Sequence, residues 1–84
     1  MAKIYVGNLL YEASEHDLAQ LFEEYSGEQA YIVRDDETGK SKGYGFVNIA
    51  DELVQHAIKA IDGTEFLGRR VYVSVARSQG RRFS

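Results

Sequence analysis

The sequence predicts a small α+β domain in which a four-stranded antiparallel sheet carries two helices on one face. Four short segments alternate aliphatic residues with polar or aromatic ones, as strands do, and two longer segments carry apolar residues at helical spacing. Turns that contain glycine or charged residues separate these segments, so the order of elements is βαββαβ. Two right-handed βαβ crossovers then place both helices on the same side of the sheet.

The first strand is predicted over residues 3–7, where two aliphatic side chains face inward and Tyr5 faces outward. The first helix is expected to begin after Ser14, because Ser14 and Asp17 form a capping-box pattern, and to end near residues 26–27. Its core-facing residues follow the i, i+3, i+4, i+7 spacing: Leu18, Leu21, Phe22 and Tyr25.

The second strand is predicted over residues 29–34, where β-branched and aromatic residues are frequent but alternate poorly. Its register therefore stays open. A polar loop over residues 35–41 turns at Gly39, and the third strand follows over residues 43–49.

Asp51 is expected to cap the second helix, which ends before Gly63 and has the core-facing residues Val54, Ala57, Ile58 and Ile61. A turn over residues 66–68 leads to the last strand. There Val71, Val73 and Val75 are expected to face inward, in alternation with Tyr72, Ser74 and Ala76. The complete order is that of a ferredoxin-like, split βαβ two-layer sandwich.

The outer face of the predicted sheet carries aromatic rings. In the third strand Val47 and Ile49 share one face, whereas Tyr44, Phe46 and Asn48 share the other. Both helices are used on the aliphatic face, and no third helix is predicted to cover the other. We therefore expect Tyr5, Tyr44 and Phe46 to be exposed together on two adjacent central strands.

Composition is that of one small domain, which we place at residues 1–77, with a short basic tail at residues 78–84. The chain has 84 residues, no cysteine and a net charge of −3. All acidic residues lie before residue 67, whereas Arg69, Arg70, Arg77, Arg81 and Arg82 follow it, so a basic edge on an acidic body is predicted. The chain runs directly into a strand pattern, so we expect no signal peptide and an intracellular location, cytoplasmic if the source is bacterial.

Two motifs resemble those of the RNA recognition motif family. Lys42-Gly43-Tyr44-Gly45-Phe46-Val47-Asn48-Ile49 is similar to the eight-residue signature K/R-G-F/Y-G/A-F-V-x-F/Y and departs from it only at Ile49. Ile4-Tyr5-Val6-Gly7-Asn8-Leu9 resembles the six-residue companion motif on the first strand. The resemblance covers about residues 3–77 and extends to small bacterial RNA-binding proteins that contain a single such motif.

The resemblance implies that single-stranded RNA binds the outer face, with two or three bases on the sheet. The family's stacking positions correspond to Tyr5, Tyr44 and Phe46, and its phosphate contact corresponds to Lys42. Further polar contacts are expected from Lys3, Arg34, Asn48 and Arg77, and two more rings could widen the platform: Tyr31 and Tyr72. We also expect Gly43 and Gly45 to leave room beside the rings for a base or sugar.

The acidic stretch over residues 35–37 lies where many relatives carry a basic residue, so we expect modest affinity and a shallow salt dependence. Arg81 and Arg82 could add phosphate contacts from the tail. Single-stranded DNA stays open as a ligand. The expected role is post-transcriptional regulation or RNA chaperoning.

Alternative readings are weaker. Cross-strand pairing that only stabilises the sheet would explain the rings without a ligand, and Tyr11 and Tyr25 are expected to be structural. No cysteine, histidine pair or Arg-containing phosphate loop points to an enzyme, a metal or a cofactor. A protein-interaction module that uses the acidic helical face is the main alternative function. We expect a monomer that contacts no membrane.

Overall fold

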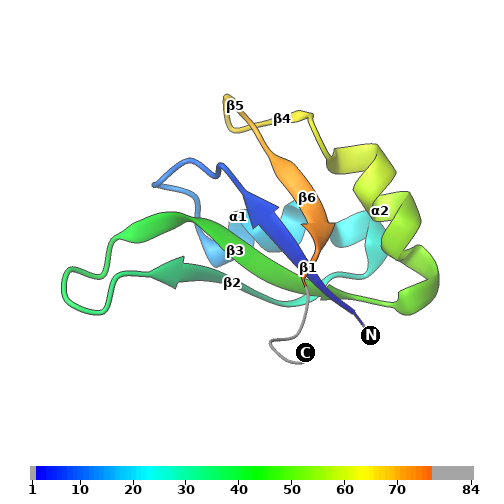
Figure 1. Cartoon of the computed structure of the whole chain (residues 1–84), viewed down its shortest axis with the longest axis horizontal. Helices are drawn as coiled ribbons and strands as arrows, with labels where there is room; N and C mark the ends of the chain where they lie inside the picture. The colour runs from blue at the N-terminus through cyan, green and yellow to red at the C-terminus, as the bar shows by residue number, and fades with distance from the viewer. Residues whose placement is uncertain (1, 77–84) are drawn as a thin grey trace, which may run out of the picture.

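The computed structural model describes residues 2–76 and contains the predicted order of elements (Figure 1). The helices and main-sheet strands are β1 (Ala2–Gly7), α1 (Glu15–Leu21), β2 (Glu28–Arg34), β3 (Ser41–Ile49), α2 (Val54–Ile61) and β6 (Tyr72–Val75). A two-stranded hairpin, β4 (Glu65–Phe66) and β5 (Arg69–Arg70), precedes β6, and short 3-10 turns cover Glu23–Tyr25 and Asp51–Leu53.

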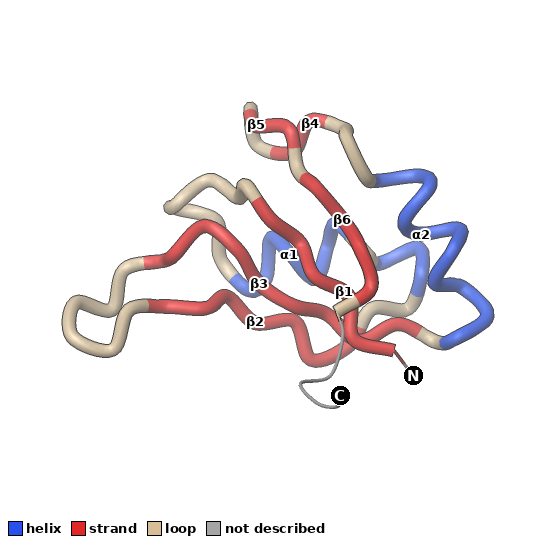
Figure 2. The backbone as a smooth tube through the Cα atoms, viewed as in Figure 1, coloured by secondary structure: helices blue, strands red, loops and turns tan. Residues whose placement is uncertain are grey.

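The main sheet is antiparallel with the strand order β2-β3-β1-β6. The motif-bearing strands β1 and β3 are therefore the two central strands. In the tube view, both helices lie behind or beside the sheet and leave its near face without a helix (Figure 2). The predicted ferredoxin-like α+β fold is confirmed.

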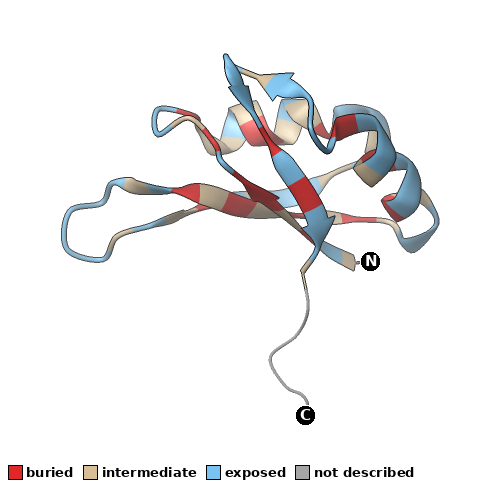
Figure 3. Cartoon of the chain, turned by 45° about the horizontal axis from the view of Figure 1, so that its top comes forward, coloured by how far each residue is buried: buried red, intermediate tan, exposed pale blue. Residues whose placement is uncertain are grey.

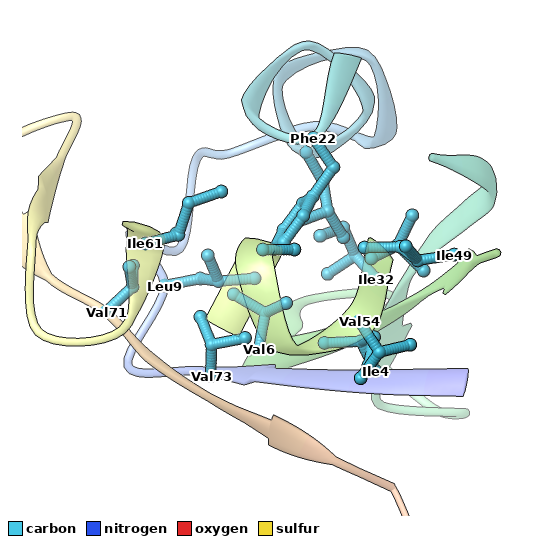
Figure 4. Packing of buried hydrophobic residues seen from close by; sticks show 13 residues of the cluster. Ile4, Val6, Leu9, Phe22, Ile32, Ile49, Val54, Ile61, Val71 and Val73 are labelled. Carbon is cyan, nitrogen blue, oxygen red and sulfur yellow. The ribbon is translucent and has the colours of Figure 1, made fainter. Parts of the chain in front are cut away.

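The core fills the space between the inner sheet face and the two helices (Figure 4). Ile4 and Val6 of β1 and Val47 of β3 are fully buried, as alternation predicts. Leu18 of α1 and Ala57 of α2 meet them from the helices. Along β6 only Val73 is buried, and the rest of the strand is exposed (Figure 3).

Helix α1 begins as predicted and ends earlier than predicted. Asp17 N–H donates to Ser14 Oγ at 3.2 Å, and Ser14 N–H donates to Asp17 Oδ2 at 3.0 Å, which completes the capping box. The regular helix stops at Leu21, and the chain tightens into the 3-10 turn Glu23–Tyr25. That turn ends at Ser26, whose φ of 57° is left-handed.

Two expectations for the second half are wrong in detail. Asp51 is not the cap of a helix. It is the first residue of the 3-10 turn Asp51–Leu53, and Ala50 occupies the N-cap position of that turn. Helix α2 starts only at Val54, with Leu53 at its N-cap position. Val75 was expected in the core but is 44% exposed. It pairs with Ile4 on one side only, because β6 is an edge strand of the sheet that residues 2–76 form.

The missing side chain of Gly45 makes room on the inner face of the sheet, not on the outer face. A Cβ built on Gly45 would collide with the Tyr31 carbonyl oxygen and lie 3.2 Å from both Ile32 Cα and Leu18 Cδ2. The absent side chain therefore lets β2 and α1 approach β3 closely. Gly43 is similar: it is buried with a φ of 86°, and its Cβ would lie 3.2 Å from a ring carbon of Tyr11. Neither glycine provides the room beside the rings that the sequence suggested.

Gly45→Ala should lower the free energy of unfolding by about 1–3 kcal/mol, the usual cost of overpacking a core. Urea unfolding followed by circular dichroism measures this change. Ser74→Ala, at an exposed site of β6, is the control and should change stability by less than about 0.5 kcal/mol. An unchanged stability for Gly45→Ala would restore the interpretation that this glycine makes room on the outer face.

The carboxylate of Glu15 ties α1 to β2. It accepts the Ile32 N–H at 3.1 Å through Oε2 and pairs with the Arg34 guanidinium at 2.9 Å through Oε1. The Ile32 hydrogen bond is the main cause that lowers the pKa of Glu15 below its usual 4.5, partial burial opposes it, and Arg34 adds a smaller lowering.

Glu15→Gln should destabilise the fold by less than about 1 kcal/mol at neutral pH, because the pair is partly exposed. A lowered folded-state pKa stabilises the fold above the unfolded pKa, and this stabilisation is lost as pH falls through the folded pKa. The free energy of unfolding in urea, measured at neutral pH and at about pH 2.5, should therefore differ between wild type and Glu15→Gln only at neutral pH. Arg34→Gln should lose less stability at neutral pH than Glu15→Gln, since the Ile32 N–H still donates to Glu15. A difference that persists in acid would contradict this assignment.

Candidate functional site

The outer face of the sheet is organised in rows of side chains that run across the strands. Residues directly opposite each other in an antiparallel ladder point to the same face. One row therefore contains Tyr31, Phe46, Tyr5 and Ser74, and the next contains Tyr44, Gly7 and Tyr72. Asn48 and Lys3 are paired in a third row, on the other side of Phe46. The strand register thus brings the three predicted stacking residues together on one surface.

Tyr5, Tyr44 and Phe46 form one aromatic cluster, which we call the platform. Ring centroids are 5.7 Å apart for Tyr5 and Tyr44, 5.9 Å for Tyr5 and Phe46, and 6.2 Å for Tyr44 and Phe46. The pairs are tilted or edge-to-face, the arrangements that aromatic quadrupoles favour. All three side chains are half-buried, not fully exposed as expected, because each ring shields part of the next.

Gly7 is the glycine that shapes the platform. A Cβ on Gly7 would lie 2.8 Å from ring atoms Cε2 and Cζ of Tyr5. The Tyr5 ring therefore extends along β1 over Gly7, a position that only a residue without a side chain leaves open. Gly7 is two residues after Tyr5, so alternation along the strand puts both on the outer face. The contact between them is seen only in the structure.

Tyr31 extends the platform onto β2. It is 44% exposed, and its ring centroid lies 5.6 Å from that of Phe46. Tyr72 lies on the same face of β6, opposite Gly7, and is 53% exposed. The two rings that could widen the platform are thus both on the outer face, on opposite sides of the trio.

The polar groups on this face cluster beside Phe46. Lys3 Nζ lies 5.6 Å from the centroid of Phe46 and 6.0 Å from that of Tyr31, within cation–π range. Asn48 Nδ2 donates to Gln29 Oε1 at 2.5 Å. Sequence reasoning missed Gln29, since the register of its strand could not be read from a poorly alternating segment.

The β2–β3 loop is built around Asp35. Asp35 Oδ1 accepts the N–H of Glu37 at 2.8 Å and of Thr38 at 3.1 Å, and Asp35 N–H donates to the Lys40 carbonyl at 2.8 Å. The hydrogen bonds from Thr38 and Glu37 hold the pKa of Asp35 below its usual value, and Lys42 contributes charge. Lys42 itself is exposed at the start of β3.

Arg34 and Arg77 are not part of the described platform. Arg34 has its guanidinium in the ion pair with Glu15 of α1, on the helix side of the sheet. Arg77, Arg81 and Arg82 lie outside the described residues. The structure therefore brings together Tyr5, Tyr44, Phe46, Lys3 and Asn48 and leaves Arg34 apart from them.

Tyr11, which the sequence suggested to be structural, is 71% exposed and has its ring beside Gly43. It lines a shallow recess of about 520 Å³ together with Glu12, Lys40 and Ser41, between the β1–α1 and β2–β3 loops. Within residues 2–76, no cluster of histidine and acidic side chains has the arrangement of a metal site, and no helix there is long and apolar enough to span a membrane.

Known proteins share both the sequence and the fold. The family model described as RNA recognition motif matches residues 4–72. RbpA of Synechocystis sp., named for RNA binding, is 44% identical over 81 residues, which cover 94% of this chain and 80% of RbpA. The 28 kDa ribonucleoprotein of Spinacia oleracea chloroplasts is 44% identical over 82 residues, or 95% of this chain and 35% of that protein.

Solved structures agree. The crystal structure of RNA binding protein PG1 has a TM-score of 0.88 and 36% identity over 96% of this chain and 100% of that one. The Sex-lethal protein in complex with RNA has a TM-score of 0.85 and 33% identity, over 95% of this chain and 49% of that one. With both motifs on adjacent central strands and the family match over most of its length, this chain belongs to the RNA recognition motif family.

Proposed function

We propose that this protein binds single-stranded RNA through the platform of Tyr5, Tyr44 and Phe46. The observation that carries the proposal is three rings within 6.2 Å of one another on a sheet face that neither helix of residues 2–76 covers. Relatives named as RNA-binding and a structural neighbour in complex with RNA support the same ligand. Apolar rings held at a surface are most simply explained by a partner that stacks on them.

Binding follows from the geometry in two steps. Bases stack on the ring faces, and each stack contributes about 1–3 kcal/mol without regard to sequence. Lys42 at the start of β3 then supplies charge for the phosphates. Tyr31 adds a ring beside Phe46, and Tyr72 a ring across Gly7, so two or three bases fit across the sheet.

Family membership points to binding and not to catalysis. We place the protein in post-transcriptional regulation or RNA chaperoning, as a cytoplasmic monomer. The second candidate is a protein partner on the acidic helical face, where a shallow recess on α1 is lined by His16, Ala19, Gln20, Glu23 and Gly27. NMR titration with short RNA should shift the resonances of the platform, whereas a protein partner would shift only those of the helices.

Tyr44→Ala and Phe46→Ala should each weaken binding of a short single-stranded RNA by about 1–3 kcal/mol, because each removes a stacking surface. Fluorescence anisotropy measures the affinity, and urea unfolding checks that the fold is kept. Tyr11→Ala is the matched control: it removes an equally large exposed ring that lies in a loop off the strands. Equal affinities for wild type and both platform variants would refute the proposal.

Neutralising the β2–β3 loop should strengthen binding. The double variant Asp36→Asn, Glu37→Gln should tighten RNA binding roughly two- to fivefold at low salt, because two negative charges that repel phosphates are removed. Asp35 is left in place since it holds the loop through its hydrogen bonds.

The same titrations, repeated over a range of salt concentrations, give the number of phosphates contacted. The logarithm of the affinity should fall by about 0.7 per contacted phosphate per tenfold rise in salt, so two or three contacts give a shallow slope. A steep slope for the wild-type protein, or no gain from the double variant, would contradict this account of the loop.

A further inference from the structure

A row of polar side chains crosses the sheet beside Phe46. Asn48 is two residues from Phe46 on the same face of β3, and Lys3 of β1 is directly opposite Asn48. On the other side, Gln29 of β2 accepts the hydrogen bond from Asn48. In space the order is therefore Gln29, Asn48, Lys3, and a base stacked on Phe46 would meet this row with its edge.

The backbone at Gln29 is unusual for a strand. Its φ is 54°, in the left-handed region that costs a residue with a side chain about 1–2 kcal/mol. Among the described residues, the other non-glycine positions with positive φ lie at turns or element ends: Asn8, Ser26 and Leu67. At Gln29 a β-bulge adds one residue to β2 between Glu28 and Tyr31. Bulges re-aim side chains, and this one brings the Gln29 amide to Asn48.

The hydrogen bond between the two amides fixes what each one offers to a ligand. Asn48 uses one of its two Nδ2 hydrogens to reach Gln29 Oε1, which leaves Asn48 with its Oδ1 acceptor and a second Nδ2 hydrogen, and Gln29 with its Nε2 donor. Lys3 Nζ is a donor and lies over Phe46 and Tyr31, in the neighbouring row of side chains. Where Asn48 Oδ1 meets the base, the row presents donor, acceptor, donor.

Uracil has the complementary edge. Its Watson–Crick edge presents an acceptor, a donor and an acceptor: O4, N3–H and O2. Cytosine has an acceptor in place of the central donor and a donor in place of one outer acceptor. Adenine has an acceptor at its centre, and guanine matches the uracil pattern at two of its three positions. We infer that Asn48, held by Gln29 and flanked by Lys3, selects uracil for the base stacked on Phe46. This inference rests on the proposed binding of RNA to the platform.

In the selected complex, Asn48 Oδ1 accepts the uracil N3–H, and the amino groups of Gln29 and Lys3 donate to the two carbonyl oxygens. The Lys3 ammonium leaves its place over the Phe46 ring when the base enters, and its flexible stem keeps it at the base edge. Glu28, opposite Asn48 in the ladder, places a negative charge beside the row. A base edge is therefore a better occupant here than a phosphate.

The test measures the affinity of the full 84-residue chain for octamers of uridine, cytidine, adenosine and 3-methyluridine by fluorescence anisotropy. The wild-type protein should bind oligouridine about fivefold or more tightly than oligocytidine. It should lose that preference with 3-methyluridine, which stacks but lacks the N3–H. Asn48→Val should weaken oligouridine binding about fivefold and change oligocytidine binding less than twofold.

Gln55→Ala, on the exposed face of α2, is the control and should leave all affinities unchanged, and thermal unfolding checks the fold of each variant. Phe46→Ala should weaken all four octamers alike. If the octamers bind with equal affinity, or Asn48→Val keeps the preference for uridine, the assignment of uracil is wrong while platform binding stands. If no octamer binds, the proposed function fails, and the uracil assignment fails with it.

Discussion

The structure depends on one geometric constraint: two helices cover only one face of a four-stranded sheet. Their apolar residues bury the aliphatic side of β1 and β3, including Ile4 and Val47, without remaining exposure. Alternation then commits the neighbouring residues, Tyr5 and Phe46, to the other face. The position of the functional surface is thus a consequence of how the core is formed. A change that shifted the register of β1 against β3 would disturb the core and the platform together.

The two sequence motifs combine residues with different tasks. In the β3 motif the rings belong to the platform, whereas Gly45 lets β2 and α1 pack closely against the inner face. In the β1 motif Gly7 is the residue that makes space on the outer face, because the Tyr5 ring lies over it. Glycines of the two motifs therefore have different roles, and the contacts of a hypothetical Cβ distinguish a role in folding from a role at the outer face.

Sequence periodicity predicted the features of the fold that depend on the local pattern of residues. It placed the platform rings correctly on one face because β1 and β3 alternate regularly, and it found the capping box of α1 from Ser14 and Asp17. It failed where tertiary structure decides. Arg34 was expected near the platform because the sequence does not reveal its tertiary partner, Glu15 of α1, which holds the guanidinium in an ion pair. Val75 fits the alternation but lies on an edge strand, a position that the sequence alone does not reveal.

The bulge in β2 would also give the aromatic surface the base selectivity that we propose. Rings accept any base, so a platform of Tyr5, Tyr44 and Phe46 alone would bind without preference. Selectivity needs donors and acceptors whose directions are fixed before the ligand arrives, since a freely rotating amide can pair with any base edge. The hydrogen bond between Asn48 and Gln29 removes that freedom, and the left-handed backbone at Gln29 makes the bond geometrically feasible. Strain in the backbone persists where the surrounding structure holds it, and here it is held next to the proposed RNA-binding face.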